Sequence, residues 1–353
     1  MKGNRNTTFG IPKENPSDIE SIRTYLHLYR GEDVVLDDAV CRDINLDEIF
    51  CYADRCLTPV GELLLYDRFR QMKRSRRLAD DEDDISKIRE DGEFRARIET
   101  ALGTVNGKRG LSVASLLNMQ VCLAGWHKFA WLIPVVECIL LILMLTCLPP
   151  AVVIVFALAA MTFNVFVHYA NKSYVDLFIR PLIQLDQLRQ SALRLTENDR
   201  FNDLQGIKRS IRNISRLSGK LRIFSLNGLL ESDVMVIFYG LVELIKTLVC
   251  IEPVMTCSIL RKIDDVSKDS RVLIEYIGGW DVLYSTASFR TWMESCGSVW
   301  SVPEFVSEKK ILYARDIYHP LIKDCVPNSI RTDRSVIITG SNMSGKSSFI
   351  KTI

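Results

Sequence analysis

The chain has 353 residues, a net charge of +2 and a hydrophobic content of 48%. Its length allows two or three domains, and its nearly balanced net charge says little about its partners. Its ten cysteines include no C-x-x-C pair and are accompanied by only four histidines. This composition argues against a zinc site or a disulfide framework and for a reducing environment.

The first part of the chain is expected to be helical after a polar N-terminal tail. Residues 1–34 begin without a signal-peptide core, and we expect them to form the tail. A helical core is predicted over 35–128, where Thr58 and Pro59 suit the N-cap and the first position of a helix. The later run KRSRRLADDEDD is interpreted as a solvated connection between helices.

An almost wholly apolar segment follows at 129–170. The pair Pro149-Pro150 divides it into two stretches of 20 residues each, Phe129–Leu148 and Ala151–Ala170. A helix of that length spans about 30 Å, the thickness of a bilayer core, and a proline pair favours a turn between two such helices. The sequence therefore predicts a transmembrane helical hairpin in contact with membrane lipid.

Basic residues flank both ends of this hairpin. Lys128 precedes it, and Lys172 and Arg180 follow it. The positive-inside rule then places both ends and the soluble parts on the cytoplasmic side of the membrane. The alternative is a buried helix pair in a large soluble core. Glu137 favours that alternative, because a carboxylate inside a bilayer costs ~2–3 kcal/mol on insertion scales.

Helical patterns resume over 171–298, which we interpret as the second part of the core. Four basic side chains are spaced to share one helix face: Arg209, Arg212, Arg216 and Lys220. Such a face suits anionic lipid headgroups or nucleic-acid phosphates, and it equally suits plain solvent. The apolar run 234–248 is predicted to be a core helix and not a third span, because it carries Glu243 and Lys246.

The most specific motif of the chain lies at 340–347 and reads G-x-x-x-x-G-K-S. In such a loop, glycines let successive backbone N–H groups converge on a phosphate, and the following helix adds its positive end. The β-branched run 335–339 predicts a buried strand before the loop. Residues 299–353 are therefore expected to begin an α/β P-loop domain. The fold class predicted for the whole chain is mainly α with an incomplete C-terminal α/β domain.

The ligand predicted for this loop is ATP with Mg²⁺. Lys346 is placed to reach the β- and γ-phosphates, and the hydroxyl of Ser347 is placed to ligate the metal. The full predicted binding set is Gly340, Ser341, Asn342, Met343, Ser344, Gly345, Lys346, Ser347 and Ser348. Hydrolysis also needs an acidic residue that holds Mg²⁺ and a group that orients water. We assign no catalytic residue and expect this chain to bind ATP without hydrolysing it.

The amino-acid sequence of the loop resembles the P-loop motif of the MutS family, T-G-x-N-M-x-G-K-S, in which Asn-Met lies inside the loop. Three further stretches are similar to the family: ILYARDIYHPLI with His319-Pro320, the T-x-x-G turn of Thr58 and Gly61, and GGWDVLYSTA around Asp281. The resemblance extends from about residue 35 to the end of the chain, outside the apolar segment. It implies an ATP-binding, mismatch-repair-related protein that binds DNA and forms a homodimer.

The chain also departs from the family pattern. No mismatch-reading domain precedes the core, and the Walker B acids of the family have no counterpart. Cys325-Val326 lies where the family has an aromatic residue that stacks on adenine, and Ser348 stands where many members have Thr. The simplest interpretation is the front portion of a membrane-anchored MutS-like ATPase, truncated after its P-loop.

Two other functions stay open at this stage. A component of a membrane transport ATPase would also combine apolar helices with a P-loop, although one hairpin is small for a translocation path. A nonfunctional structural remnant would retain the motif without turnover. The Asn-Met pair inside the loop favours the MutS-like interpretation over both.

Overall fold

The computed structural model describes residues 9–30, 36–71, 78–105, 111–118, 129, 131–196, 204–225, 247, 251–304, 306 and 311–353. The first elements are α1 (Ile19–Arg30), α2 (Asp38–Asp43), α3 (Leu46–Ala53), α4 (Pro59–Arg70), α5 (Leu78–Glu90), α6 (Gly92–Leu102) and the 3-10 helix η2 (Ser112–Asn118). They continue with α7 (Leu132–Cys147), α8 (Pro150–Thr196), α9 (Leu204–Ser225), α11 (Ile251–Leu260), α12 (Ile263–Ser295), β1 (Leu312–Ile317), β2 (Asn328–Thr332) and α13 (Lys346–Thr352). The described chain is mainly helical, as the sequence predicts.

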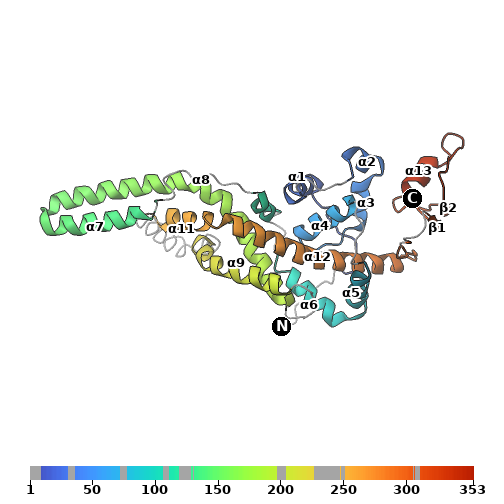
Figure 1. Cartoon of the computed structure of the whole chain (residues 1–353), viewed down its shortest axis with the longest axis horizontal. Coiled ribbons are helices and arrows are strands. Elements are labelled where there is room, and N and C mark those ends of the chain that lie inside the picture. Colours follow the sequence, from blue (N-terminus) through green and yellow to red (C-terminus); the bar gives the residue numbers. More distant parts are fainter. Residues whose placement is uncertain are drawn as a thin grey trace.

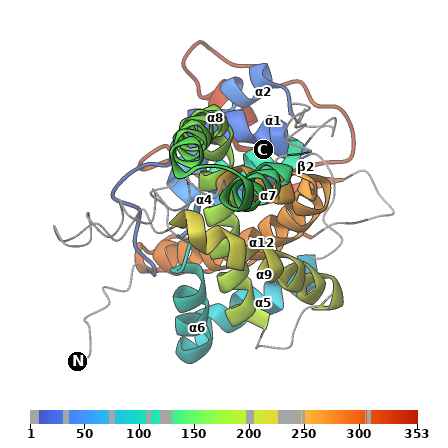
Figure 2. The ribbon, with the colours of Figure 1, turned by 90° about the vertical axis from the view of Figure 1, so that its left-hand side faces the viewer.

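The long helix α12 is the axis of the molecule. Helices α4, α5, α8, α9 and η2 pack along its length, and the core contains its fully buried residues Ile277, Trp280 and Tyr284. Figure 1 shows an elongated molecule in which α7 and α8 project from one end, while β1, β2 and α13 lie at the other. Figure 2, seen from the α7–α8 end, shows the remaining helices gathered around α12.

The start of α4 confirms the predicted cap. Thr58 has extended backbone angles, its side-chain oxygen accepts a hydrogen bond from the N–H of Gly61, and Pro59 is the first helical residue. Leu63 and Tyr66 are fully buried on the same helix. These local signals suffice to begin a helix here because a cap and an N1 proline satisfy or remove the first free N–H groups.

The expected N-terminal tail is wrong for residues 9–30. This part of the chain packs against the core through α1, which buries Ile22 and Leu26 at a spacing of four residues. The ammonium of Lys13 lies 2.5 Å from the Asp54 carboxylate and 2.6 Å from that of Glu62. The polar composition concealed one apolar helix face, which is enough to dock a short helix.

The acidic run expected to be a solvated connection is also helical. It forms the first half of α5, where acidic residues suit the positive end of the helix dipole. Arg290 of α12 forms a two-bond ion pair with Glu82, with N–O distances of 2.5 and 2.7 Å. Arg68 lies 3.3 Å from Asp81. Charge pairing with the core therefore orders a segment whose composition alone suggests exposure.

The apolar segment forms two helices that lie side by side, α7 and the first part of α8 (Figure 1). Leu148 caps α7 with extended angles, and α8 begins at Pro150. The first helix is shorter than expected, with 16 residues from Leu132 instead of 20 from Phe129. Pro134 explains this start, because a proline lacks the N–H for a fourth-residue bond and is tolerated only in the first turn.

The second helix is longer than expected. It continues from the apolar segment through Pro181 to Thr196, so residue 170 is not a helix boundary. Its later half buries Leu182, Leu185 and Leu188 in the core. Among the described residues, one segment, Pro150–Ala170, is long and apolar enough to cross a membrane, and the apolar α7 falls below that length.

The C-terminal part contains a two-stranded antiparallel sheet formed by β1 and β2. The strand predicted at 335–339 is wrong, since these residues have no regular structure and Ile337 is 89% exposed. A β-branched run supplies propensity only. It becomes a strand when a neighbour pairs its N–H and C=O groups and a second layer covers its side chains, and the described residues provide neither here.

Two adjacent glycines of α12 give a matched test of the helix packing. A Cβ on Gly278 would lie 2.5 Å from Leu64 Cδ1 and 2.9 Å from the Val60 carbonyl oxygen, whereas one on Gly279 would meet nothing within 4 Å. We expect Gly278→Ala to lower the free energy of unfolding by about 1–3 kcal/mol through overpacking. Gly279→Ala should raise it by about 0.5–1 kcal/mol. Urea unfolding followed by circular dichroism measures both, and equal effects would contradict the close α4–α12 contact.

Candidate functional site

The predicted phosphate-binding loop lies between the segment 335–339 and α13. Gly345 caps α13 with φ of +83°, and Met343 has φ of +67°. Glycine adopts the first conformation without the steric cost that a side chain would add. A Cβ on Gly340 would lie 2.8 Å from Ser344 Oγ, so the loop is also closed tightly at its first glycine.

The side chain of Lys346 folds back into this loop. Its ammonium donates to the carbonyl oxygens of Gly340 at 2.8 Å and Ser341 at 2.5 Å, and lies 3.5 Å from Ser344 Oγ. The loop therefore curls around one positive charge. Carbonyl oxygens of the loop hold this ammonium, and an anion would have to replace them as its partners.

The remaining predicted binding residues lie on the surface around this lysine. Ser341, Asn342, Met343, Ser344 and Ser347 are exposed, and Ser348 is half-buried. Within the described ranges, no three His, Cys, Asp or Glu side chains group into a metal site. A hydroxyl such as that of Ser347 can still contribute one ligand to Mg²⁺, because this ion takes its other oxygens from phosphates and water.

The residues predicted to lead into this domain are placed close to the loop helix. His319 is buried, and its Nδ1 accepts a hydrogen bond from the N–H of Leu321 at 3.2 Å. Lys351 of α13 donates to Asn45 Oδ1 at 3.1 Å, which ties the loop helix to the start of α3. A cavity of about 480 Å³ lies at this junction, lined by Asn45, Glu48, His319, Leu321, Ile322, Ser348 and Lys351.

The structure does not bring an aromatic ring to this region from Cys325-Val326. Cys325 is half-buried, Val326 is 74% exposed, and Asn328 Nδ2 donates to the Val326 carbonyl oxygen at 2.9 Å. The segment has no regular structure and leads directly into β2. If adenine binds near these residues as predicted, it meets the small aliphatic side chain of Val326. This side chain offers less stacking area than an aromatic ring.

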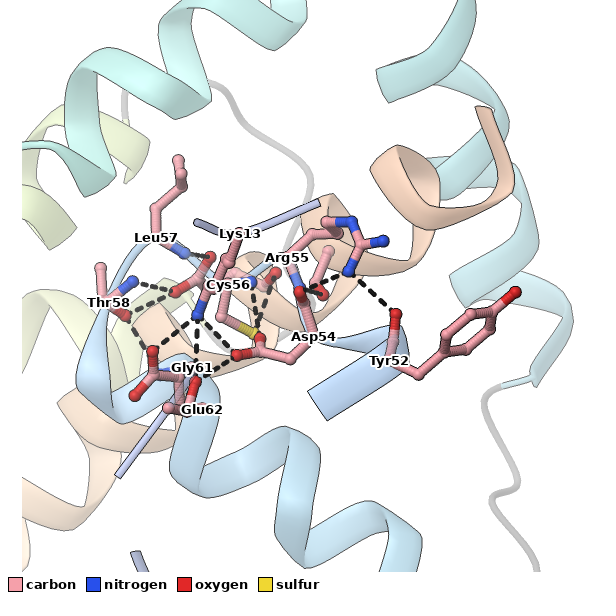
Figure 3. A network of polar contacts seen from close by, with 12 residues as sticks. Lys13, Tyr52, Asp54, Arg55, Cys56, Leu57, Thr58, Gly61 and Glu62 are labelled. Atoms are coloured by element: carbon pink, nitrogen blue, oxygen red, sulfur yellow. Dashed lines mark hydrogen bonds and ion pairs between the residues drawn. The ribbon is translucent and has the colours of Figure 1, made fainter. Parts of the chain in front are cut away.

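Two of the motif stretches meet in the core, although 223 residues separate Thr58 from Asp281. The Asp281 carboxylate accepts hydrogen bonds from the N–H groups of Leu57 at 2.8 Å and Thr58 at 2.7 Å, and from the Thr58 hydroxyl at 2.6 Å. The same hydroxyl accepts from Gly61 (Figure 3). A Cβ on Gly61 would overlap the carboxylate. The glycine is needed for this close approach.

Burial strongly affects the Asp281 carboxylate. Its removal from water raises its pKa to about 7, and the hydrogen bonds from Leu57 and Thr58 limit the rise. Nearby, burial opposes the charge of Lys13, but Asp54 and Glu62 outweigh it and raise the pKa of this ammonium. The start of α4 thus lies within a connected buried network of polar groups (Figure 3).

Sequence reasoning missed the lysine of this network and its role. Lys13, Ser17 and Asp54 form one cluster, in which Ser17 Oγ donates to Asp54 at 2.6 Å and Asp54 accepts from the N–H of Cys56 at 2.8 Å. The apolar spacing of α1 was the available signal, since it would have placed residues 9–30 on the core.

The chain was compared with known proteins at three levels. Comparisons with protein-family models, with curated proteins and with solved structures each find no match.

The raised pKa of Asp281 gives a pH test. Its folded pKa of about 7 lies above the ordinary value of 3.8, so the folded state binds the proton more tightly. The free energy of unfolding should therefore fall as pH rises between these values, by up to about 1.4 kcal/mol per pH unit from this group. Asp281→Asn should remove this contribution. Thermal unfolding of both proteins from pH 4 to pH 8 measures it; parallel pH profiles would contradict the burial argument.

Proposed function

We propose that this chain is a MutS-like, ATP-binding protein that α7 and the first part of α8 anchor in a membrane, with its soluble parts in the cytoplasm. The arrangement of Lys346 inside its loop carries the nucleotide part of this proposal. The loop sequence T-G-S-N-M-S-G-K-S supports the MutS-like part of the proposal. The exposed apolar surface of α7 and α8 supplies the membrane part.

The geometry of the loop supports a triphosphate ligand. Gly345 in the left-handed region turns the chain into α13, and the Lys346 ammonium lies among loop carbonyls that a phosphate oxygen can replace as its partner. In this proposal, the Lys346 ammonium binds the β- and γ-phosphates and Ser347 contributes a ligand to Mg²⁺. Both ligands come from solution, since the loop is exposed.

The helical part supports the family assignment through one long-range contact. The resemblance singled out the T-x-x-G turn and the stretch around Asp281 separately. In the fold, Asp281 accepts two hydrogen bonds from Thr58, and Gly61 allows the approach. The two stretches lie far apart in the sequence, but they form one contact in the fold. That contact explains why Thr, Gly and Asp stand at these positions.

The apolar helices support the membrane anchor. Large side chains point outward on all sides of the pair, among them Ile142 at 63%, Val155 at 67% and Phe166 at 70% exposure. A water-soluble protein rarely leaves so large a continuous apolar surface uncovered. The one carboxylate, Glu137, accepts a hydrogen bond from Asn164 Nδ2 at 2.9 Å within the pair, which lowers the cost of placing it in lipid.

DNA binding, a role in mismatch repair and a homodimer stay predictions of the resemblance. The transport alternative has less support, because among the described helices only Pro150–Ala170 is long and apolar enough to cross a membrane, with α7 as a shorter apolar helix beside it. The proposal therefore stands on the loop, the Asp281 joint and the apolar pair.

Lys346→Ala tests the nucleotide site. We expect at least a tenfold loss of affinity for ATP, because the charge-assisted contact to phosphate is removed. Ser347→Ala should instead reduce the gain in affinity that Mg²⁺ provides. Lys351→Ala is the matched control on the same helix, since its side chain contacts Asn45 and not the loop. Titration calorimetry with and without Mg²⁺ measures all three. Equal affinity of the Lys346 and Lys351 variants would contradict the proposal.

Leu158→Arg tests the anchor. Leu158 is exposed in the apolar part of α8, and Leu193 is exposed in the core part of the same helix. Arginine at a bilayer centre costs about 2.5–3.5 kcal/mol, whereas Leu193→Arg stays in water. We expect the parent chain and Leu193→Arg to resist alkaline carbonate extraction from membranes, and a smaller share of Leu158→Arg to do so. Recovery of the parent chain in the soluble fraction without detergent would refute the anchor.

A further inference from the structure

A second concave site lies between α9 and α12, away from the phosphate-binding loop. Its volume is about 550 Å³, within the range of small-molecule pockets. Four basic residues line it: Arg209 and Arg216 from α9, Lys262 at the cap of α12, and Lys268 from its second turn. The pocket therefore concentrates positive charge at one point of a chain whose overall charge is nearly balanced.

These four cations are exposed, and none of them forms a direct ion pair within the described structure. No ion pair joins Arg209, Arg216, Lys262 or Lys268 to an acidic side chain among the residues that the structure describes. Two carboxylates also line the pocket, so positive charges exceed negative charges there by two. Such an excess in a concavity attracts an anion more strongly than the same charges spread over a convex surface.

One of the two carboxylates forms hydrogen bonds that join α9 to α12. Asp269 accepts hydrogen bonds from Ser210 Oγ at 2.7 Å and from Asn213 Nδ2 at 3.1 Å. This fixes α9 against α12 and holds the polar floor of the pocket in one arrangement. A preformed floor lowers the entropic cost of binding a ligand.

The backbone adds to the same field. The pocket includes Lys262 and Val266 in the cap and first turn of α12, a helix of 33 residues. No side chain caps this helix end through a hydrogen bond. The lining residues run along the side of α12 from Lys262 to Val272, so one end of the pocket lies beside the positive end of the α12 dipole.

Arg212 shows that the pocket differs from an ordinary basic helix face. The sequence placed Arg209, Arg212 and Arg216 on one face, but Arg212 does not line the pocket. Its Nε donates to the Lys208 carbonyl oxygen at 3.3 Å. The side chain of Lys220 lies outside the described residues. The pocket lining contains no aromatic ring on which a nucleic-acid base could stack.

We propose that the pocket between α9 and α12 binds a compact anion that carries a phosphomonoester or pyrophosphate group. Its excess of two positive charges favours a ligand with two or more negative charges, and its size favours a small molecule or a single headgroup over a polymer. A soluble phosphate compound and a phosphate lipid headgroup share this chemistry. The proposal does not depend on the nucleotide site, because no residue is shared between the two.

The test uses the full chain with Lys346→Ala, in neutral detergent, so that the loop does not bind the probe. Inorganic pyrophosphate is the probe, and calorimetry gives its affinity. We expect Arg209→Gln with Arg216→Gln to lower the affinity about tenfold or more, and Arg212→Gln to change it less than about twofold. Circular dichroism and thermal unfolding establish that the variants fold alike.

Two further arms identify the source of the phosphate. In the same micelles, binding of short-chain phosphatidic acid is compared with binding of phosphatidylcholine. Tighter binding of phosphatidic acid that pyrophosphate competes away identifies a lipid headgroup as the ligand. Pyrophosphate binding without a preference between these lipids reports a soluble compound. No pyrophosphate binding in the Lys346→Ala chain, or equal affinity in the double variant and Arg212→Gln, would overturn the proposal. Duplex DNA binding that all three arginines reduce equally would also overturn it, since a diffuse face would then bind phosphate.

Discussion

The buried carboxylate of Asp281 holds the start of α4 against the middle of α12, and the rest of the structure depends on this joint. It accepts three hydrogen bonds from Leu57 and Thr58, and Gly61 and Gly278 let the two helices approach without side chains between them. Burial of this carboxyl group is costly, and its three hydrogen bonds offset part of that cost. The first α-helical segments are thereby fixed to a helix that lies more than 200 residues later in the chain.

From this joint, α12 extends toward both ends of the molecule (Figure 1). At one end, α9 and α11 flank it near the apolar pair (Figure 1). At the other, Arg290 packs 4.2 Å from the centre of the Trp300 ring while it pairs with Glu82, which fixes the exit toward β1. Lys351 then ties α13 to Asn45. The proposed anchor thus packs on α12 through α8, and the proposed nucleotide loop contacts the start of α3 through Lys351.

Local chemistry made some of this predictable and left other parts hidden. Thr58 and Pro59 carry a cap and a first-position proline, which act within one turn, so the start of α4 could be predicted from the sequence. The phosphate-binding role of the loop around Lys346 stays a prediction from its motif. The strand at 335–339 depends on neighbours that propensity does not supply. The ion pairs of Lys13 join positions that no local sequence pattern connects. Pro134 could have indicated the later start of α7, but the length of the apolar run favoured an earlier one.

A double-mutant cycle between Thr58 and Asp281 tests the central claim most directly. The free energies of unfolding of Thr58→Ala, Asp281→Ala and the double variant give the interaction between the two side chains. If this joint holds the helical scaffold together, the effects will be non-additive, with a coupling of about 1.5–3 kcal/mol, as for a hydrogen bond to a charged or fully buried group. Additive effects, within about 0.5 kcal/mol, would contradict the account.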